Sequence, residues 1–345
     1  MSGSGLDVGG KSSSQRIASL DGLRTLSIVM VLFGHLWGTY GFPKNVVTEA
    51  LAQYAHLGVQ VFFVISGFLI TTLLLREHKS TGRIDLYAFY RRRMFRIFPA
   101  AFFYITVMAI VARPGYLWWA YTYLMCYAGD GRPWLLGHLW SLSVEEQFYM
   151  VWPLALITWF SRRATVAIAV FLLAPVARLV FWQFGMHSID EYFPAVADSL
   201  AAGCLLAFWI DKVRERGRWL THPVVFTVLG MAVLAIPFMF PRLRLYILFG
   251  GVAPVLIALF LFAAVERADW FLNNRVMYAG GALSYSAYLW QQAFLNRNLH
   301  AWWTSFPVNL LLAFAAAAGS YFVVEKPFLK LGHRTKQRSV ARVNT

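Results

Sequence analysis

The chain is organised as long apolar runs separated by short polar and basic segments. A helix needs about 20 apolar residues to cross the hydrocarbon core of a bilayer, and ten of the runs approach or reach that length. They lie near residues 22–40, 56–75, 94–112, 139–160, 164–184, 192–210, 223–240, 245–265, 277–298 and 306–324. We therefore predict an all-α integral membrane protein of about ten transmembrane helices.

The segments outside these runs predict the domain organisation. Residues 1–18 are rich in Ser and Gly and predict a flexible tail. The first run is longer than the apolar part of a signal peptide and lacks an obvious small-residue cleavage site, so we interpret it as a span. The stretch 116–128 is apolar but short and aromatic, which is typical of an interfacial or re-entrant piece. We expect one transmembrane domain over 19–328, followed by a basic tail over 329–345.

Composition excludes several classes of protein. The chain is 59% hydrophobic and 14% charged, whereas soluble domains are about 45–50% apolar and about 25% charged. This argues against a water-soluble enzyme, a disordered chain and a fibrous protein. The net charge is +15, but the basic residues stand between apolar runs, so we attribute them to membrane topology and expect no nucleic-acid partner. The two cysteines indicate neither a disulfide framework nor a metal site.

The distribution of basic residues predicts the orientation. With the N-terminus inside, the inner segments hold 23 of the 31 Lys and Arg residues and the outer loops hold 6. The outer six include Arg242 and Arg244, and the remaining two, Arg24 and Arg178, lie within apolar runs. Because cytoplasmic loops are enriched in Lys and Arg, this excess predicts an even number of spans with both termini in the cytoplasm.

Two polar residues of the first run share a helix face. Arg24 and His35 are 11 residues apart, which is about three turns and roughly 16 Å along a helix. A charged side chain inside a bilayer is energetically costly, so the presence of Arg24 and of His35 needs a functional or structural explanation. Such a face would connect an anionic ligand inside the cell to a reactive group deeper in the membrane. The alternatives are a snorkelling anchor for Arg24 and a hydrogen-bonded packing role for His35.

A pair of acids in the fourth run is the predicted partner of His35. Glu145 and Glu146 lie about six or seven residues from the outer end of their run, and His35 lies about five residues from the outer end of its own. The matched depths predict a contact in which one carboxylate orients the imidazole. Adjacent helix positions point about 100° apart, so at most one of the two faces His35. The alternative is a packing ion pair, for example with Arg178.

A basic cluster stands where the third run begins, in the segment FYRRRMFRIFPA. Arg93 and Arg96 are three residues apart and share a face. We expect them in the first helical turn, where the helix dipole also favours anions. Arginine forks bind phosphates, which suits a nucleotide-like ligand such as coenzyme A. The positive-inside rule is the alternative explanation, above all for Arg91 and Arg92.

Other polar positions in the runs carry less information. Asp198 and Arg178 suit either a structural pairing or a functional role. The segment LSYSAYLWQQ contains Ser284, Tyr285, Ser286 and Tyr288, which we expect to hydrogen-bond between helices. The sequence has no Walker loop, Gly-rich dinucleotide turn, HExxH or GxSxG motif.

Taken together, these segments resemble the membrane acyltransferase-3 family of bacterial glycan, nodulation-factor and macrolide O-acyltransferases. The resemblance is carried, in order, by LDGLRTLSIVMVLFGH, HLGVQVFFVISGFLITTLL, RRRMFRIFP, HLWSLSVEEQFYMVWP, DSLAAGCLLA, LSYSAYLW and VEKPF. The fourth of these is the most specific match. The matches spread from residue 20 to residue 328 and therefore cover nearly the whole chain.

The resemblance implies a ten-helix domain in a bacterial inner membrane that uses acyl-CoA, commonly acetyl-CoA, and no metal. It implies that Arg24 and His35 are essential, with His35 in the chemistry as a general base or a transient acyl carrier. It also implies that Arg93 and Arg96 contact the phosphates of CoA. The pair Glu145 and Glu146 is expected to contribute a functional carboxylate.

Two positions depart from the family pattern. Gln291 stands where the family often has His, and Gln60 replaces an acid usual before VFF, so no role is carried over to either. Some members add an extracytoplasmic hydrolase-like domain, which is not in this sequence. We expect that the membrane domain acts alone or that a separate extracytoplasmic transferase protein completes the reaction.

We therefore predict a membrane O-acyltransferase that moves a short acyl group, acetyl in the first instance, from acyl-CoA to a hydroxyl of a glycan or other polyhydroxylated acceptor. The rival hypothesis is a multi-span, proton-coupled exporter of a glycan or small solute. The sequence shows no pair of Gly/Pro-broken helices in two related halves, which argues against a transporter. A third hypothesis is a non-catalytic partner in a glycan-assembly complex.

Overall fold

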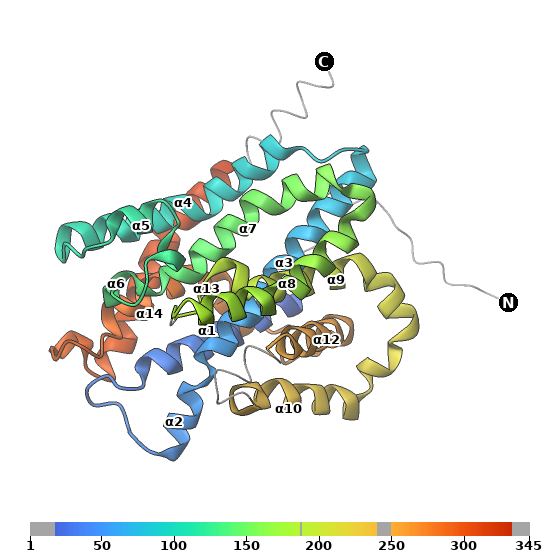
Figure 1. Ribbon diagram of the computed structural model, residues 1–345. Helices are drawn as coiled ribbons and strands as arrows, with labels where there is room; N and C mark the ends of the chain where they lie inside the picture. Colours follow the sequence, from blue (N-terminus) through green and yellow to red (C-terminus); the bar gives the residue numbers. More distant parts are fainter. Residues whose placement is uncertain (1–17, 187, 240–249, 333–345) are drawn as a thin grey trace.

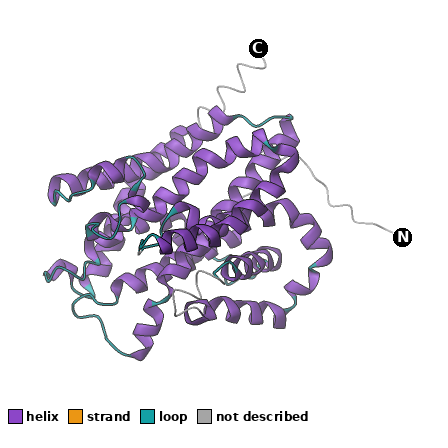
Figure 2. Ribbon diagram, viewed as in Figure 1, coloured by secondary structure: helices purple, strands orange, loops and turns teal. Residues whose placement is uncertain are grey.

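The computed structural model describes residues 18–186, 188–239 and 250–332, and within these ranges the chain forms helices and no strand (Figure 2). This confirms the all-α prediction for the described part of the chain. The predicted tails 1–18 and 329–345 lie almost entirely outside the described residues, as do Arg242 and Arg244.

Each of the ten apolar runs coincides with a helix in the structure. The helices are α1 (Ala18–Leu36), α3 (Tyr54–Thr81), α4 (Leu86–Val111), α7 (Leu139–Thr158), α8 (Arg163–Gln183), α9 (Phe193–Arg216), α10 (Pro223–Met239), α12 (Val252–Arg267), α13 (Arg275–Phe294) and α14 (Val308–Ser320). Among the described residues, six helical stretches are long and apolar enough to cross a membrane, namely Ser19–Leu36, Val46–Thr81, Leu86–Val111, Phe160–Gln183, Phe193–Arg216 and Val308–Gly332. The chain is thus a multi-pass membrane protein, while ten spans and cytoplasmic termini stay predictions.

Helices α7 and α13 are long but too polar to be counted among those six. Each has 20 residues, and each buries a row of polar side chains against its neighbours. The buried set is Ser141, Ser143 and Glu146 on α7 and Ser284, Ser286, Gln291 and Gln292 on α13. Buried polar groups in a membrane protein face the bundle interior and mark functional surfaces, so these two helices are where a site is expected.

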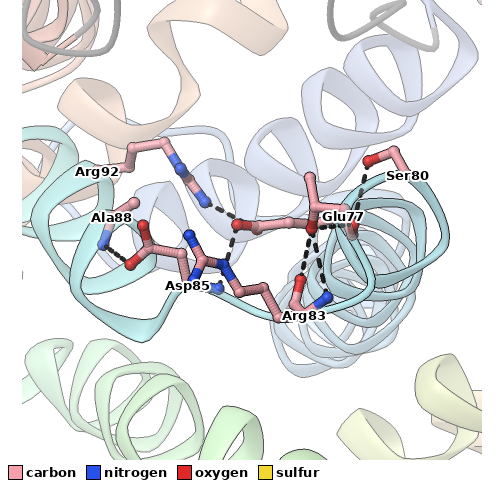
Figure 3. Close-up of polar contacts among 7 residues, drawn as sticks. Glu77, Ser80, Arg83, Asp85, Ala88 and Arg92 are labelled. Atoms are coloured by element: carbon pink, nitrogen blue, oxygen red, sulfur yellow. Dashed lines mark hydrogen bonds and ion pairs between the residues drawn. The ribbon is translucent and has the colours of Figure 1, made fainter. Parts of the chain in front are cut away.

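The start of α4 differs from the prediction because of a helix cap. Asp85 precedes the helix and its side chain accepts a hydrogen bond from the Ala88 N–H at 2.9 Å. Glu77, on the last turns of α3, accepts from the Asp85 N–H and from the Arg92 guanidinium, each at 3.3 Å (Figure 3). The helix therefore begins at Leu86, well before the predicted residue 94.

This earlier start corrects one sequence-based expectation. Arg93 and Arg96 lie about two and three turns inside α4, not in its first turn. The helix dipole acts mainly on the first turn. Any anion binding by Arg93 and Arg96 must therefore come from their own guanidinium charges.

Close helix crossings explain how the core helices are held together. Helices α3 and α9 cross at Gly67 and Gly203, where an added Cβ would overlap the carbonyl oxygens of Leu200 and Val64 (Figure 1). Gly281 brings α13 equally close to the backbone of Asp21 on α1. Small residues let membrane helices approach until their backbones touch, which replaces the hydrophobic driving force that is absent in lipid.

The contacts also set the relative directions of the helices. The start of α1 meets the start of α13, since the Thr25 hydroxyl donates to the Met277 carbonyl at 2.6 Å, and the ends of both helices meet near His35 and Gln292. Helices α1 and α13 are thus parallel. Helix α7 runs the opposite way, and Figure 1 shows α4 and α7 on one side of the bundle with α10 and α12 on the other.

The aromatic stretch 116–128 folds as short helices that do not span. It forms α5 (Leu117–Tyr121) and the 3₁₀ turn η1 (Met125–Tyr127), and α6 (Trp134–Gly137) follows. The Met125 N–H donates to the Ser143 hydroxyl at 3.2 Å, which ties η1 to α7. The stretch is therefore short and does not span, as predicted, while its interfacial or re-entrant position stays a prediction.

Arg178 and Asp198 form a buried ion pair between α8 and α9, and each side chain is only 1% exposed. Arg178 also donates to the Ala195 carbonyl at 2.8 Å. Of the two alternatives for these residues, the structure supports the packing pair. The acid that pairs with Arg178 is thus Asp198, not Glu145 or Glu146.

Candidate active site

A cavity of about 750 Å³, including its open mouth, lies among α1, α3, α4, α7 and α13. Four of the six residues singled out in the sequence line it, namely Arg24, Arg93, Arg96 and Glu145. The other lining residues are Val59, Phe62, Phe63, Ser66, Ile97, Ser141, Leu142, Tyr149, Ser284, Tyr285 and Tyr288. We call this space the arginine cavity.

The three arginines differ in their surroundings. Arg24 lies 3.6 Å from the buried carboxylate of Asp21, its neighbour one turn earlier. Arg93 places its guanidinium over the ring of Tyr149, 5.0 Å from the ring centroid. Arg96 is exposed and stands at the mouth. Three cations around one opening form a site for an anion with several phosphate groups.

Glu145 belongs to the wall of the arginine cavity. The Tyr149 hydroxyl donates to the Ser66 hydroxyl at 3.1 Å, and the Ser66 hydroxyl donates to the Glu145 carboxylate at 2.5 Å. This chain of hydrogen bonds fixes the carboxylate beside the arginines. Glu146 points elsewhere, does not line the cavity and is 5% exposed. Of the two glutamates, then, Glu145 is the one that lines the cavity, while Glu146 interacts with Arg93 from outside it.

His35 lies at the other end of α1, away from both glutamates. Its Nε2 is 3.0 Å from the side-chain amide nitrogen of Gln292, and its ring meets the edge of Trp134 at 5.6 Å between centroids. The predicted contact of His35 with Glu145 or Glu146 is wrong, since the hydrogen-bonding partner of the ring is an amide of α13.

The error comes from the position of one helix end. Helix α1 ends at Leu36, not at the predicted residue 40, so His35 lies in the last turn. Helix α7 begins beside it, where His138 reaches Gln292. Glu145 is seven residues further along α7 than His138, which is about 10 Å deeper in the bundle. His35 and the two glutamates therefore lie at different depths in the bundle, contrary to the prediction.

A hydrogen-bonded wall separates the arginine cavity from His35. The cavity-lining Tyr288 donates its hydroxyl proton to the His138 carbonyl at 2.6 Å, and the Ser141 hydroxyl lies 2.6 Å from the same Tyr288 oxygen. The ring of His138 contacts the Gln292 amide oxygen at 2.9 Å. His35 is thus linked to the cavity through Gln292, His138 and Tyr288.

The expected hydrogen bonds of the LSYSAYLW segment are present in large part. Tyr285 donates to the Ile97 carbonyl of α4 at 2.8 Å, and Ser286 donates to the buried carboxylate of Glu325 at 2.7 Å. Tyr288 reaches α7 as described. Ser284 instead bonds to the Gly281 carbonyl of its own helix. Three of the four therefore join helices, and two of those three also line the cavity.

Comparison with known proteins decides the family. The sequence profile described as "Acyltransferase domain" matches residues 17–325. The chain belongs to this acyltransferase-3 family. Membership assigns an acyltransferase domain to the chain and favours the acyltransferase hypothesis over the transporter.

Named relatives of the family cover most of this chain. O-acetyltransferase OatA of Staphylococcus aureus (strain NCTC 8325 / PS 47) is 29% identical over 93% of the chain and 58% of its own length. "Putative peptidoglycan O-acetyltransferase YrhL" of Bacillus subtilis (strain 168) is 27% identical over 94% of the chain and 56% of its own length. The chain thus spans little more than half of these relatives. No solved structure gives a significant match.

Sequence reasoning missed four polar residues of this candidate site. Ser66 and Tyr149 orient Glu145, while His138 and Gln292 contact each other and Gln292 reaches His35. His138 opens the HLWSLSVEEQF segment, which was the available signal. Among the residues the structure describes, no group of three or more His, Cys, Asp or Glu side chains is arranged to hold a metal, and the expectation of a metal-free reaction stays a prediction.

Proposed function

We propose that this acyltransferase moves a short acyl group, acetyl in the first instance, from acyl-CoA to a hydroxyl of a bacterial glycan. The observation that carries the proposal is the convergence of Arg24, Arg93 and Arg96 on one cavity in a chain with an acyltransferase domain. The phosphates of CoA are the part of that donor which three guanidinium groups recognise.

The arginine cavity is the proposed donor site. Arg96 at the mouth and Arg93 inside it hold the phosphates, with Arg24 adding charge from α1. Glu145 offsets part of that positive charge and is fixed through Ser66. The pantetheine arm then points along the cavity toward Ser141 and Tyr288, which lie on the far wall.

His35 is the proposed reactive group. It acts as a general base on the acceptor hydroxyl or as a transient acyl carrier. Because Tyr288 and Gln292 stand between the cavity and His35, the thioester meets the imidazole only when these side chains rotate aside. Glu146 is proposed to support the α7 wall behind Glu145, since its carboxylate lies outside the cavity.

The acceptor class is inferred from the relatives. The Bacillus subtilis relative is named a putative peptidoglycan O-acetyltransferase, and OatA of Staphylococcus aureus is named an O-acetyltransferase. A glycan with free hydroxyl groups is therefore the first acceptor to test. We place the protein in a bacterial inner membrane, with the arginine cavity facing the cytoplasmic supply of acyl-CoA, and with a separate extracytoplasmic transferase protein as a candidate partner.

Release of free CoA thiol tests this function. Purified protein in nanodiscs is incubated with acetyl-labelled acetyl-CoA and peptidoglycan fragments or other polyhydroxylated acceptors. We expect thiol release and labelled acceptor from the wild type, and neither from His35→Ala at equal folded amount. A His35→Ala variant with wild-type turnover would overturn the role of His35. Movement of a solute across liposomes without acyl-CoA, and no thiol release, would overturn the acyltransferase function itself.

A further inference from the structure

The hydrogen bonds around Gln292 determine which way its side-chain amide points. The backbone N–H of His138 lies 3.2 Å from Gln292 Oε1 and can only donate. The atom facing it must therefore be the amide oxygen, which also faces His138 Nδ1 at 2.9 Å. The amide nitrogen is then the atom that faces His35 Nε2 at 3.0 Å.

This orientation determines the tautomer of His35. A side-chain NH₂ group donates hydrogen bonds and accepts none, so His35 Nε2 must supply its lone pair and carries no proton. In a neutral imidazole the proton is then on Nδ1. Among the described residues the buried Nδ1 makes no hydrogen bond of ordinary geometry, and the Val31 backbone and the Gln291 side chain are the groups near the ring with which it interacts.

We propose that Gln292, anchored by His138, is a positioning residue that holds His35 as the Nδ1-protonated tautomer. The inference rests on the proposed role of His35. It identifies Nε2 as the basic or acyl-accepting atom, because only that nitrogen has an available electron pair. As a base, Nε2 takes the proton of the acceptor hydroxyl and the ring becomes an imidazolium, while the hydroxyl oxygen bonds to the acyl carbon. The C–S bond of the thioester then breaks, and the ring returns the proton to the departing CoA sulfur, which leaves as a free thiol. The Gln292 N–H has to move away before the first of these steps.

The anchor of Gln292 is itself well fixed. The His138 ring lies between two acceptors, Gln292 Oε1 and the Leu289 carbonyl, which is 3.1 Å from Nε2, and a neutral ring donates to only one of them. The backbone N–H of His138 donates to Gln292 Oε1 in either case, and the His138 carbonyl accepts from Tyr288 at 2.6 Å. His138 and Gln292 are 3% and 4% exposed. The indole of Trp134, which touches the His35 ring, donates to the Gln292 backbone carbonyl at 3.1 Å. The backbone N–H of His138 thus defines the resting direction of the amide and the tautomer that it selects, and the Gln292 side chain turns aside only when the acyl donor reaches His35.

Gln292→Glu is the decisive substitution. It keeps the size of the side chain and an acceptor for His138, but in its ionised form it replaces the donor that faces His35 with an oxygen that can only accept. The His35 proton is then expected to move from Nδ1 to Nε2. The matched control is Gln147→Glu, which makes the same chemical change on α7, where Gln147 contacts Tyr123 and Tyr127 but not His35.

The test has a spectroscopic and a kinetic arm. Protein labelled with ¹⁵N-histidine in nanodiscs reports the protonation of each ring nitrogen, and comparison with His35→Gln assigns the His35 signals. We expect an unprotonated Nε2 in the wild type and a protonated Nε2 in Gln292→Glu. We also expect kcat to fall roughly 100-fold or more because the tautomer is wrong, with an unchanged KM for acetyl-CoA because Gln292 does not line the arginine cavity.

The outcomes separate this inference from the proposed function. A wild-type His35 protonated on Nε2 overturns the inference, and that measurement stands even where a variant fails to fold. Wild-type kcat in Gln292→Glu with an exchanged tautomer also overturns it. If acetyl-CoA is not used by the wild type or by Gln147→Glu, the proposed function has failed, while the tautomer assignment is still decided by the spectra.

Discussion

Arg93→Met, compared with Arg92→Met, tests how the arginine cavity recognises its donor. The two arginines are neighbours in the sequence and carry the same charge, but their surroundings differ. Arg93 lines the cavity and lies on the ring of Tyr149, whereas Arg92 lies 3.3 Å from Glu77 at the end of α3. Methionine keeps most of the apolar stem in both cases, so the comparison isolates the guanidinium group.

The expected magnitude follows from the contact that is lost. A hydrogen bond to a charged group contributes about 1.5–3 kcal/mol, and each 1.4 kcal/mol is a factor of ten in a dissociation constant. Arg93→Met should therefore weaken CoA binding about 10- to 100-fold. Arg92→Met should change it little, because an exposed ion pair such as the one with Glu77 contributes about 0–1 kcal/mol and lies outside the cavity.

Calorimetric titration of CoA into protein in nanodiscs measures the dissociation constant of each variant directly. Repeating the titration with dephospho-CoA assigns the contact. If Arg93 binds the 3′-phosphate, the difference between wild type and variant disappears with this ligand; if it binds the diphosphate, the difference persists. Equal affinity of Arg93→Met and wild type for CoA would refute the phosphate clamp. So would an equally large loss in Arg92→Met, because the effect would then reflect general positive charge and not the cavity.

Three further substitutions test the packing and the cavity wall. Arg178→Met leaves Asp198 as a buried, unpaired acid and should cost about 3–5 kcal/mol, while adding Asp198→Leu should restore the melting temperature; an unstable double variant would contradict this. Gly203→Val should abolish folded protein in size-exclusion chromatography, because a Cβ there overlaps the α3 backbone, whereas Gly319→Val, with open space around it, should not. Ser66→Ala removes the donor to the cavity carboxylate and should lower kcat/KM for acetyl-CoA about 10- to 100-fold, since the lost bond is to a charged group; an unchanged value would show that this bond does not matter.

Local pattern was enough to predict the helices and the grouping of the arginines. Apolar run length located the ten long helices named above because lipid requires the backbone to satisfy its own hydrogen bonds. Arg24, Arg93 and Arg96 were predicted together from their residue type and family motif, and the structure brings them to one cavity. The cap at Asp85 could have been recognised from sequence, but the apolar run alone placed the start of that helix too late.

The contacts of His35 could not be predicted in the same way. Its partner depends on where α1 ends and on how α7 and α13 are aligned, and a shift of four residues moves a side chain by about 6 Å along a helix. The sequence also did not identify Gln292 as a functional residue, because two adjacent glutamines do not form a recognisable motif. Its role becomes visible only when the backbone N–H of His138 fixes the direction of the amide.

The most direct test of the central claim is a cryo-electron-microscopy structure of the protein in nanodiscs with bound CoA. We predict phosphate density between Arg93 and Arg96 and a pantetheine arm that ends near Ser141 and Tyr288. CoA density outside the arginine cavity, or an empty arginine cavity at a CoA concentration that supports turnover, would contradict it.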